Sequence, residues 1–315
     1  MISTLTIGTR GSALALYQAR LVEQLIQEAN PGLETKIQIV ETVGDKDRKT
    51  ALSKVSQVAQ VQRGIFIKEL EEALTVGEVD IAVHSLKDMP SVLNEGFSLP
   101  VCLVRASRED VLVSKYPDGL QGLPKGAVIA TGGVRRQRQL KSLRGDLQIT
   151  EIRGNVPTRL KKVALGDDMD ATLLAAAGLE RLDYPVGDKV EIEGVDLYLH
   201  RLSTEDFLPP GGQGVIAIET LTEKLDFIDP ILAPLNCVQT AKECDAERQF
   251  LAHLGASCDT PVAAMAETLE SGELRMEVRY WHEDEIAPFV ATLMGRNPED
   301  LATDLVAKVL PQKNI

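Results

Sequence analysis

An apolar run at residues 81–83 is followed at once by four polar side chains, His84, Ser85, Lys87 and Asp88, and then by Pro90. If the apolar run is a central parallel strand, its carboxyl end lies where open α/β sheets place their ligands. Lys87 and Asp88 would then face a crevice, where an ammonium and a carboxylate suit acid–base or charge-stabilising chemistry on a polar substrate. The alternative for this stretch is an ordinary ion pair at an exposed strand end.

Strand and helix patterns alternate through the first hundred residues. Apolar spacing and turn residues predict strands at 5–8, 36–41 and 79–83 and helices at 14–29 and 64–74. Residues 44–63 are polar and lysine-rich, which predicts a long loop. This alternation is typical of a doubly wound α/β sheet.

The rest of the chain predicts a second and a third α/β unit. After about Leu103 the apolar runs predict strands at 110–113, 127–130, 147–150 and 171–177, and residues 183–203 are expected to be irregular, as a surface hairpin. A proline- and glycine-rich crossing at 207–214 precedes an apolar strand at 215–218, which could return the chain to the first sheet. The third unit has a predicted helix at 232–254, strands at 273–278 and 289–293, and a final helix at 298–310.

Basic residues concentrate in one window of an acidic chain. The formal net charge is −13, yet residues 131–162 hold nine basic and two acidic side chains, so this window is +7 and the remainder −20. A nucleic acid would be repelled by most of such a surface. The pattern favours a small anionic ligand.

Three predicted strands end in a small-residue turn beside arginine. The first turn holds Arg10 and Ser12. Thr131 lies in the second, before a predicted helix that carries Arg135 and Arg136, and Arg153 lies in the third, before a predicted helix that carries Arg159. Helix N-termini and glycines let an anion approach the backbone, and the arginine fork matches a carboxylate. The set predicts a site for several carboxylates, whereas any one of these arginines taken alone is also explained by a solvated helix face.

The cysteines and histidines do not indicate a metal site. Four cysteines lie far apart without a CxxC pair, and only four histidines accompany them, so neither a disulfide framework nor a zinc cluster is predicted. Cys258 lies in a turn of small residues at 255–261, where it could be reactive or carry a covalent group. A structural thiol is the alternative.

Membrane and export signals are not recognisable in the sequence. The first eight residues lack a basic region and a long apolar segment, and no stretch approaches the roughly 18 apolar residues of a membrane helix. We therefore expect a cytoplasmic protein without a membrane partner.

Eight segments together resemble the porphobilinogen deaminase family, also called hydroxymethylbilane synthases. They occur in the family's order and cover nearly the whole chain: 9–16, 64–71, 84–90, 134–137, 153–160, 177–182, 212–214 and the Cys258 turn. The resemblance implies two doubly wound domains similar to type II periplasmic-binding proteins that flank a cleft, and a small C-terminal α/β domain. The expected boundaries are 1–103 with 207–230, 104–206, and 231–315.

The resemblance also implies the activity. Such a transferase deaminates four porphobilinogen molecules and joins them head to tail into hydroxymethylbilane, in porphyrin and heme biosynthesis. The reaction is primed by a dipyrromethane cofactor, expected here on Cys258 through a thioether. A monomer acting on a small molecule is expected, without a metal.

Residue roles follow by motif. Asp88 would be the catalytic carboxylate, with Lys87 and Arg10 beside it. The substrate would be bound by Ser12, Lys54, Arg63, Ser85, Thr131, Arg135, Arg136, Arg153, Arg159, Arg181 and Gln213. The cofactor would be held by Cys258, Asp88, Lys87, Arg135 and Arg136.

The chain departs from the family pattern at three places. Gly132 and Gly133 stand where two serines are common, Arg63 replaces a lysine, and residues 256–257 before the cysteine replace a glycine pair. Two other hypotheses therefore stay open. One is a solute-binding module without chemistry, and the other is a paralogue with lost or changed activity.

Overall fold

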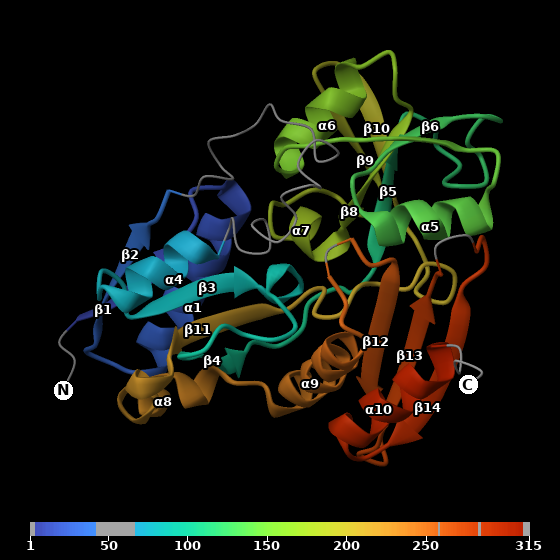
Figure 1. Ribbon diagram of the computed structural model, residues 1–315. Coiled ribbons are helices and arrows are strands. Elements are labelled where there is room, and N and C mark those ends of the chain that lie inside the picture. The colour runs from blue at the N-terminus through green and yellow to red at the C-terminus, as the bar shows by residue number, and fades with distance from the viewer. Residues whose placement is uncertain (1–3, 42–66, 258, 283–284, 311–315) are drawn as a thin grey trace. The chain divides into compact units, whose positions relative to one another are not determined.

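The computed structural model describes residues 4–41, 67–257, 259–282 and 285–310. The chain divides into two compact units, Met1–Ala106 with Val215–Ala241 and Ser107–Gly214 with Lys242–Ile315. The first unit holds one sheet and the second unit holds two (Figure 1). The fold is α/β, with two larger sheet domains and a small C-terminal domain, as predicted.

The first sheet has the strand order β2-β1-β3-β11-β4. Its strands are β1 (Thr4–Thr9), β2 (Glu34–Ile39), β3 (Ile81–Ser85), β4 (Phe97–Cys102) and β11 (Ile216–Leu221). β1 is parallel to both of its neighbours, and β11 is antiparallel to β3 and β4. The chain thus returns to this sheet after residue 214, which confirms the predicted crossing, whereas β4 was not predicted.

Helices cover both faces of the first sheet. α1 (Ala13–Ala29) and α8 (Leu225–Leu232) pack on one face, where Val22 and Ile26 meet Ile7 and Ile218. α4 (Lys68–Thr75) packs on the other face. Side chains alternate between the two faces along each strand. Apolar residues therefore point to both faces of this sheet, and helices pack against them on each face.

The second sheet has the order β7-β6-β8-β5-β10-β9. Its strands are β5 (Asp110–Ser114), β6 (Val128–Ala130), β7 (Gln148–Thr150), β8 (Ala171–Ala175), β9 (Lys189–Ile192) and β10 (Val195–Arg201). α5 (Val134–Leu143) covers one face, and α6 (Val156–Leu165) with α7 (Ala176–Glu180) covers the other. β6 is parallel to β7 and β8 while β5 is antiparallel to β8, so the pattern of strand directions in the first sheet recurs.

The expectation of an irregular segment at 183–203 is wrong. It forms a hairpin, as expected, but β10 also pairs with β5 inside the second sheet. Leu197 and Leu199 are fully buried, and they alternate with polar residues in β10. This alternation of buried and polar side chains gives the segment a strand inside the sheet.

The third sheet is an antiparallel meander, β12-β13-β14. It comprises β12 (Val262–Thr268), β13 (Leu274–Tyr280) and β14 (Phe289–Gly295), with α9 (Val238–His253) and α10 (Pro298–Val309) packed on one face. The predicted helix at 232–254 is interrupted by a 3-10 turn (Ala233–Leu235) and an extended Asn236, since Pro234 lies at this point. β12 was not predicted.

In the part of the chain covered by the structure, no helix combines the length and apolar character needed to cross a membrane.

Candidate functional site

Asp88 lies at the carboxyl end of β3, where the sequence placed it. The strand ends at Ser85, and a 3-10 turn, Leu86–Asp88, follows. The Leu86 side chain is buried, and its N–H donates to the carbonyl of Val215 at 3.0 Å. This anchored turn leaves Lys87 half-buried and the Asp88 side chain exposed.

Arg10 and Ser12 follow β1, which lies parallel to β3 in the same sheet. The carboxyl ends of parallel strands lie at the same edge of a sheet. The turn between β1 and α1, which contains Arg10 and Ser12, therefore lies at the same edge as the Asp88 turn. The Ser12 hydroxyl caps α1 by accepting the N–H of Ala15 at 3.3 Å. Ser85 accepts a hydrogen bond from Gln18 Nε2 at 2.9 Å.

Gln18 was not predicted as a site residue. It is a buried polar residue of α1 and the hydrogen-bond partner of Ser85. Its sequence signal is a polar residue on the apolar face of an amphipathic helix.

A second polar group lies behind β3, on the opposite face from Ser85. His84 Nε2 lies 2.9 Å from Glu219 Oε2, and both side chains are buried. Nearby, Asn94 donates to both oxygens of Glu71, and burial raises the pKa of the Glu71 carboxyl. Neighbouring strand residues face opposite sides of a sheet, so His84 belongs to this buried group and not to the Ser85 face.

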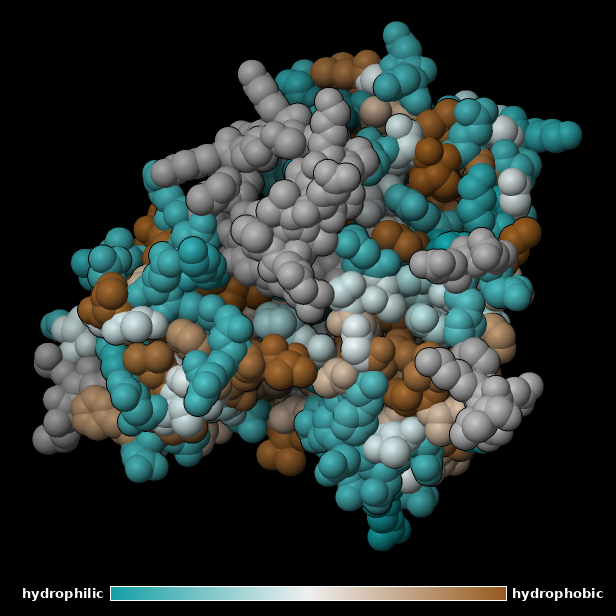
Figure 2. All heavy atoms as spheres, viewed as in Figure 1, coloured by the Kyte–Doolittle hydropathy of each residue, from teal (hydrophilic) through white to brown (hydrophobic). Residues whose placement is uncertain are grey.

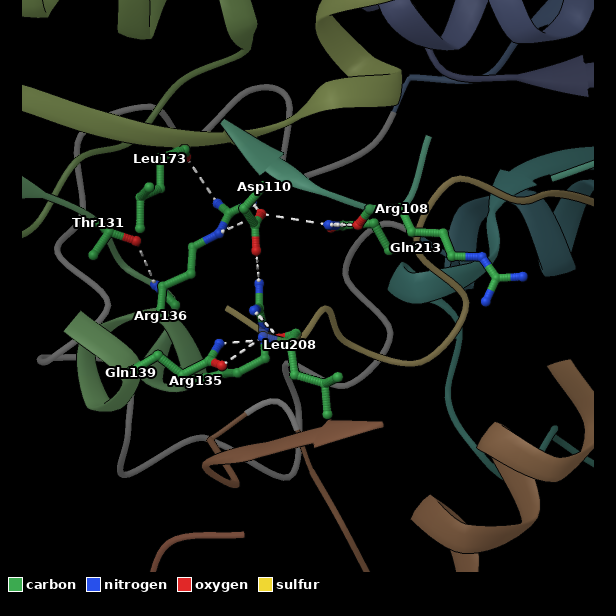
Figure 3. Close-up of polar contacts among 10 residues, drawn as sticks. Arg108, Asp110, Thr131, Arg135, Arg136, Gln139, Leu173, Leu208 and Gln213 are labelled. Carbon is green, nitrogen blue, oxygen red and sulfur yellow. Dashed lines mark hydrogen bonds and ion pairs between the residues drawn. The ribbon is translucent and has the colours of Figure 1, made fainter. Parts of the chain in front are cut away.

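The second unit contains a buried cluster of two arginines around Asp110 (Figure 3). Arg135 Nη2 lies 2.6 Å from Asp110 Oδ2, and Arg136 donates to Oδ1 from Nη2 at 2.5 Å and from Nε at 3.1 Å. Asp110 is fully buried at the start of β5. Burial lowers the pKa of Arg135, and the adjacent carboxylate partly offsets this effect.

Backbone carbonyls and two glutamines complete this cluster. Arg135 donates to the carbonyl of Leu208 at 2.6 Å, and Arg136 donates to that of Leu173 at 2.9 Å. Gln213 is fully buried, and its Nε2 donates to the carbonyl of Arg108 at 2.7 Å and lies 3.4 Å from Asp110 Oδ1. One carboxylate thus serves two guanidinium groups, which leaves an excess positive charge suited to a further carboxylate.

Asp110 and Gln139 were missed as members of this site. Gln139 donates to the carbonyl of Leu208 at 3.0 Å and accepts its N–H at 2.8 Å. Asp110 stands at the start of an apolar strand in the sequence. Its negative charge, opposite in sign to the basic residues at 131–162, was the available signal that it could pair with them.

Thr131 lies in the three-residue turn between β6 and α5. It is buried, its carbonyl accepts from Gln137 Nε2 at 3.0 Å, and its hydroxyl lies 3.4 Å from the N–H of Gly133. Gly133 is the N-cap of α5 and offers no side-chain cap. Thr131 therefore supplies a polar contact at the helix end that a serine at 133 could otherwise make.

Arg153 and Arg159 follow β7, in the turn to α6 and in that helix. β7 pairs in parallel with β6. The Nε and Nη2 atoms of Arg153 are buried and have no hydrogen-bond partner among the described residues. Arg159 donates to the carbonyl of Gly154 at 2.7 Å. Gly154 has a φ of +123°, and a Cβ there would lie 2.7 Å from Thr158, so only glycine fits this turn.

The remaining predicted residues lie in different places. Arg181 donates to the carbonyl of Gly214 at 2.7 Å, next to Gln213 in the chain. Cys258, Lys54 and Arg63 lie outside the described residues. Beside Cys258, the N–H of Ser257 donates to the hydroxyl of Thr260 at 2.8 Å, and β12 begins directly after the turn.

The described residues hold no group of three histidine, cysteine or acidic side chains placed to bind a metal ion. On the face shown in Figure 2, hydrophobic side chains lie in small groups among hydrophilic ones. Such a distribution is ordinary for a protein surface and marks no ligand site by itself.

Two family models match the chain. Residues 5–229 match "Porphobilinogen deaminase, dipyromethane cofactor binding domain", and residues 241–311 match "Porphobilinogen deaminase, C-terminal domain". The chain is 43% identical to the porphobilinogen deaminase of Syntrophotalea carbinolica over 270 residues, which cover 85% of this chain and 80% of that protein. It is 40% identical to that of Maridesulfovibrio salexigens over 294 residues, which cover 93% of this chain and 86% of that protein.

The chain was also compared with solved structures. The effector-binding domain of BenM with benzoate has a TM-score of 0.42 and 18% identity, over 81% of this chain and 94% of that one. The family models and the curated relatives together cover most of the sequence, and they agree with each other. The chain belongs to the porphobilinogen deaminase family.

Proposed function

We propose that this chain is an active hydroxymethylbilane synthase with Asp88 as its catalytic carboxylate. The reaction deaminates four porphobilinogen molecules and joins them head to tail into the linear tetrapyrrole. Each ring brings two carboxylates, and the guanidinium groups of Arg135, Arg136 and Arg153 are suited to bind carboxylates. The exposure of Asp88 at a strand end leaves its carboxylate accessible to a substrate.

The observation that carries this proposal is the Arg153 guanidinium. Two of its nitrogen atoms are buried without a hydrogen-bond partner in the described part of the chain. Buried charged donors without a partner are unfavourable, and a carboxylate would satisfy both through a two-pronged contact. The position of Arg153 beside β7, next to the Thr131 corner, suits the acidic side chains of a pyrrole ligand.

The same donor set suits a dipyrromethane cofactor, which also carries acidic side chains. Cys258 would hold it through a thioether, with Arg135, Arg136 and Lys87 at its carboxylates and Asp88 at its pyrrole N–H groups. When bound, the cofactor supplies the primer to which the first substrate ring is joined. The unpaired Arg153 donors and the excess charge around Asp110 support the fit of this group.

Asp88 would act on the substrate in three ways. Loss of ammonia from porphobilinogen leaves an electron-poor methylene pyrrole, and a fixed carboxylate stabilises the positive charge that develops there. The same carboxylate can accept a hydrogen bond from a pyrrole N–H and take up a proton. Arg10, on the same sheet edge, would hold a substrate carboxylate beside it.

The direct experiment is to supply the purified chain with porphobilinogen and follow ammonia release together with bilane formation. An active synthase produces both. A solute-binding protein would bind porphobilinogen and release no ammonia, and a paralogue without activity would do neither or yield a different product. The resemblance also supports a cytoplasmic monomer, for which sedimentation at several protein concentrations tests the oligomeric state.

Arg153→Gln is expected to raise the KM for porphobilinogen by about 10- to 100-fold, the effect of losing one charge-assisted hydrogen bond to a carboxylate. Its melting temperature should stay close to that of the wild type, because the lost N–H groups have no described partner. Steady-state kinetics and thermal melting check both parts.

The matched control is Arg144→Gln. Arg144 donates to both oxygens of Asp146 at 2.8 Å and to the carbonyl of Leu120 at 2.9 Å, so its loss should lower the melting temperature and leave KM unchanged. If Arg153→Gln instead behaves like Arg144→Gln, Arg153 is a structural residue.

A further inference from the structure

Groups from outside the third sheet occupy the outer edge of β12. The N–H of Ala264 donates to the carbonyl of Pro209 at 3.1 Å, and the N–H of Ala266 donates to Glu247 Oε1 at 2.9 Å. The N–H of Thr268 donates to Glu243 Oε1 at 3.0 Å. These are alternate residues of the strand, so each of its outward N–H groups from 264 to 268 is satisfied.

Arg108 binds at the same edge through its guanidinium. Nη1 donates to the carbonyl of Ala266 at 2.7 Å, and Nη2 lies 2.6 Å from Glu243 Oε2. The Arg108 side chain is 21% exposed and that of Glu243 is 2% exposed, so the pair is largely removed from water. A planar guanidinium can reach acceptors on two elements at once, β12 and α9, which a lysine ammonium does less well.

The backbone of Arg108 belongs to the arginine cluster. Its carbonyl accepts the 2.7 Å hydrogen bond from Gln213 Nε2, and Asp110 follows two residues later. Figure 3 shows this carbonyl meeting Gln213 while the guanidinium extends away from Asp110. One residue thus joins the edge of β12 to the group that holds the two arginines.

We propose that Arg108 is a positioning residue for the carboxylate-binding site. Its guanidinium fixes residues 108–110 against β12, and thereby fixes the carbonyl that orients Gln213 and the carboxylate that orients Arg135 and Arg136. β12 begins directly after residues 259–261, so the same contact also fixes the start of this strand relative to the arginine cluster. This inference rests on the proposed function for its effect on substrate.

The chain offers a matched control in Arg279 of β13. Arg279 Nη1 donates to the carbonyl of Asp206 at 3.0 Å, and its Nη2 donates to the carbonyl of Glu205. It therefore also joins the third sheet to the segment before Gly214, through two carbonyls. Its guanidinium also binds Glu277, whereas the carbonyl of Arg108 accepts a hydrogen bond from Gln213.

The experiment compares Arg108→Gln with Arg279→Gln by hydrogen–deuterium exchange and by steady-state kinetics. Arg108→Gln should speed amide exchange in residues 110–114 and 207–214 and raise the KM for porphobilinogen about three- to tenfold, with kcat nearly unchanged. Arg279→Gln should leave KM and exchange at 110–114 as in the wild type. Arg108→Lys, which keeps the charge but not the fork, should give an intermediate result and serves if the glutamine variant does not fold.

Equal exchange at 110–114 and equal KM in the two glutamine variants would overturn the positioning role. Exchange is measured without turnover, so it decides this inference even if the wild-type chain makes no bilane. A wild type that makes no bilane would refute the proposed function instead, and the two failures are therefore distinguishable.

Discussion

Asp88→Asn is expected to lower kcat by about 100-fold or more, because an amide can neither neutralise a developing cation nor accept a proton as a carboxylate does. The fold should be unaffected. The Asp88 side chain is exposed, and its carboxylate makes no hydrogen bond or ion pair with the described residues. Single-turnover kinetics of ammonia release and thermal melting by circular dichroism measure the two quantities.

Asp80→Asn is the control at the other end of the same strand. Asp80 Oδ2 accepts the N–H of Thr6 at 2.8 Å, and Oδ1 lies 3.8 Å from Lys224 Nζ. This variant should melt at a lower temperature and keep its kcat. Near-full turnover by Asp88→Asn would mean that another group carries out the chemistry.

Asp110→Asn is expected to lower the free energy of unfolding by about 3–5 kcal/mol, the usual effect of removing one partner of a buried ion pair. Arg135 and Arg136 would then hold two positive charges in a site where their side chains are only 9% and 12% exposed. Trp281, the one tryptophan of the sequence, lies buried in the same unit, so its fluorescence during urea unfolding measures the loss.

Asp146→Asn separates burial from charge pairing. Asp146 also has a two-pronged contact with an arginine, Arg144, but its side chain is 28% exposed. Water can replace that contact, so the variant should be far less destabilised. Equal losses in the two variants would contradict the importance of burial at Asp110.

Local signals in the sequence were sufficient to predict the strand ends at which the candidate site residues lie. The apolar run before Asp88 indicates the end of a strand, and the sequences around Thr131 and Arg153 each combine a strand, a turn and a helix within about ten residues. Such patterns depend on neighbouring residues, and the structure has a strand ending before Asp88 and a helix after each of the other two turns. The position of Arg10 and Asp88 at one sheet edge followed from the expected parallel strands.

Partners distant in sequence could not be predicted in this way. Arg135, Arg136 and Arg153 look equivalent in the sequence, yet the first two share Asp110 and Arg153 has buried donors without a described partner. Which arginine meets a carboxylate depends on the pairing of β5 with β8 and on the chain path at Leu208. The edge contacts of Arg108 arise in the same manner, from residues more than 130 positions away.

Strands β4 and β12 were missed for a related reason. β4 contains a proline, Pro100, at the outer position of the first sheet, and β12 is rich in alanine, a weak strand former. Tertiary pairing with β11 and β13 stabilises them in place of local propensity.

The mass of the intact purified protein tests the central claim most directly. We predict a mass above that of the bare polypeptide by two linked pyrroles, either as purified or after incubation with porphobilinogen, and the bare mass for Cys258→Ser under both conditions. A wild-type chain that keeps the bare mass after incubation with porphobilinogen would contradict a dipyrromethane-primed synthase.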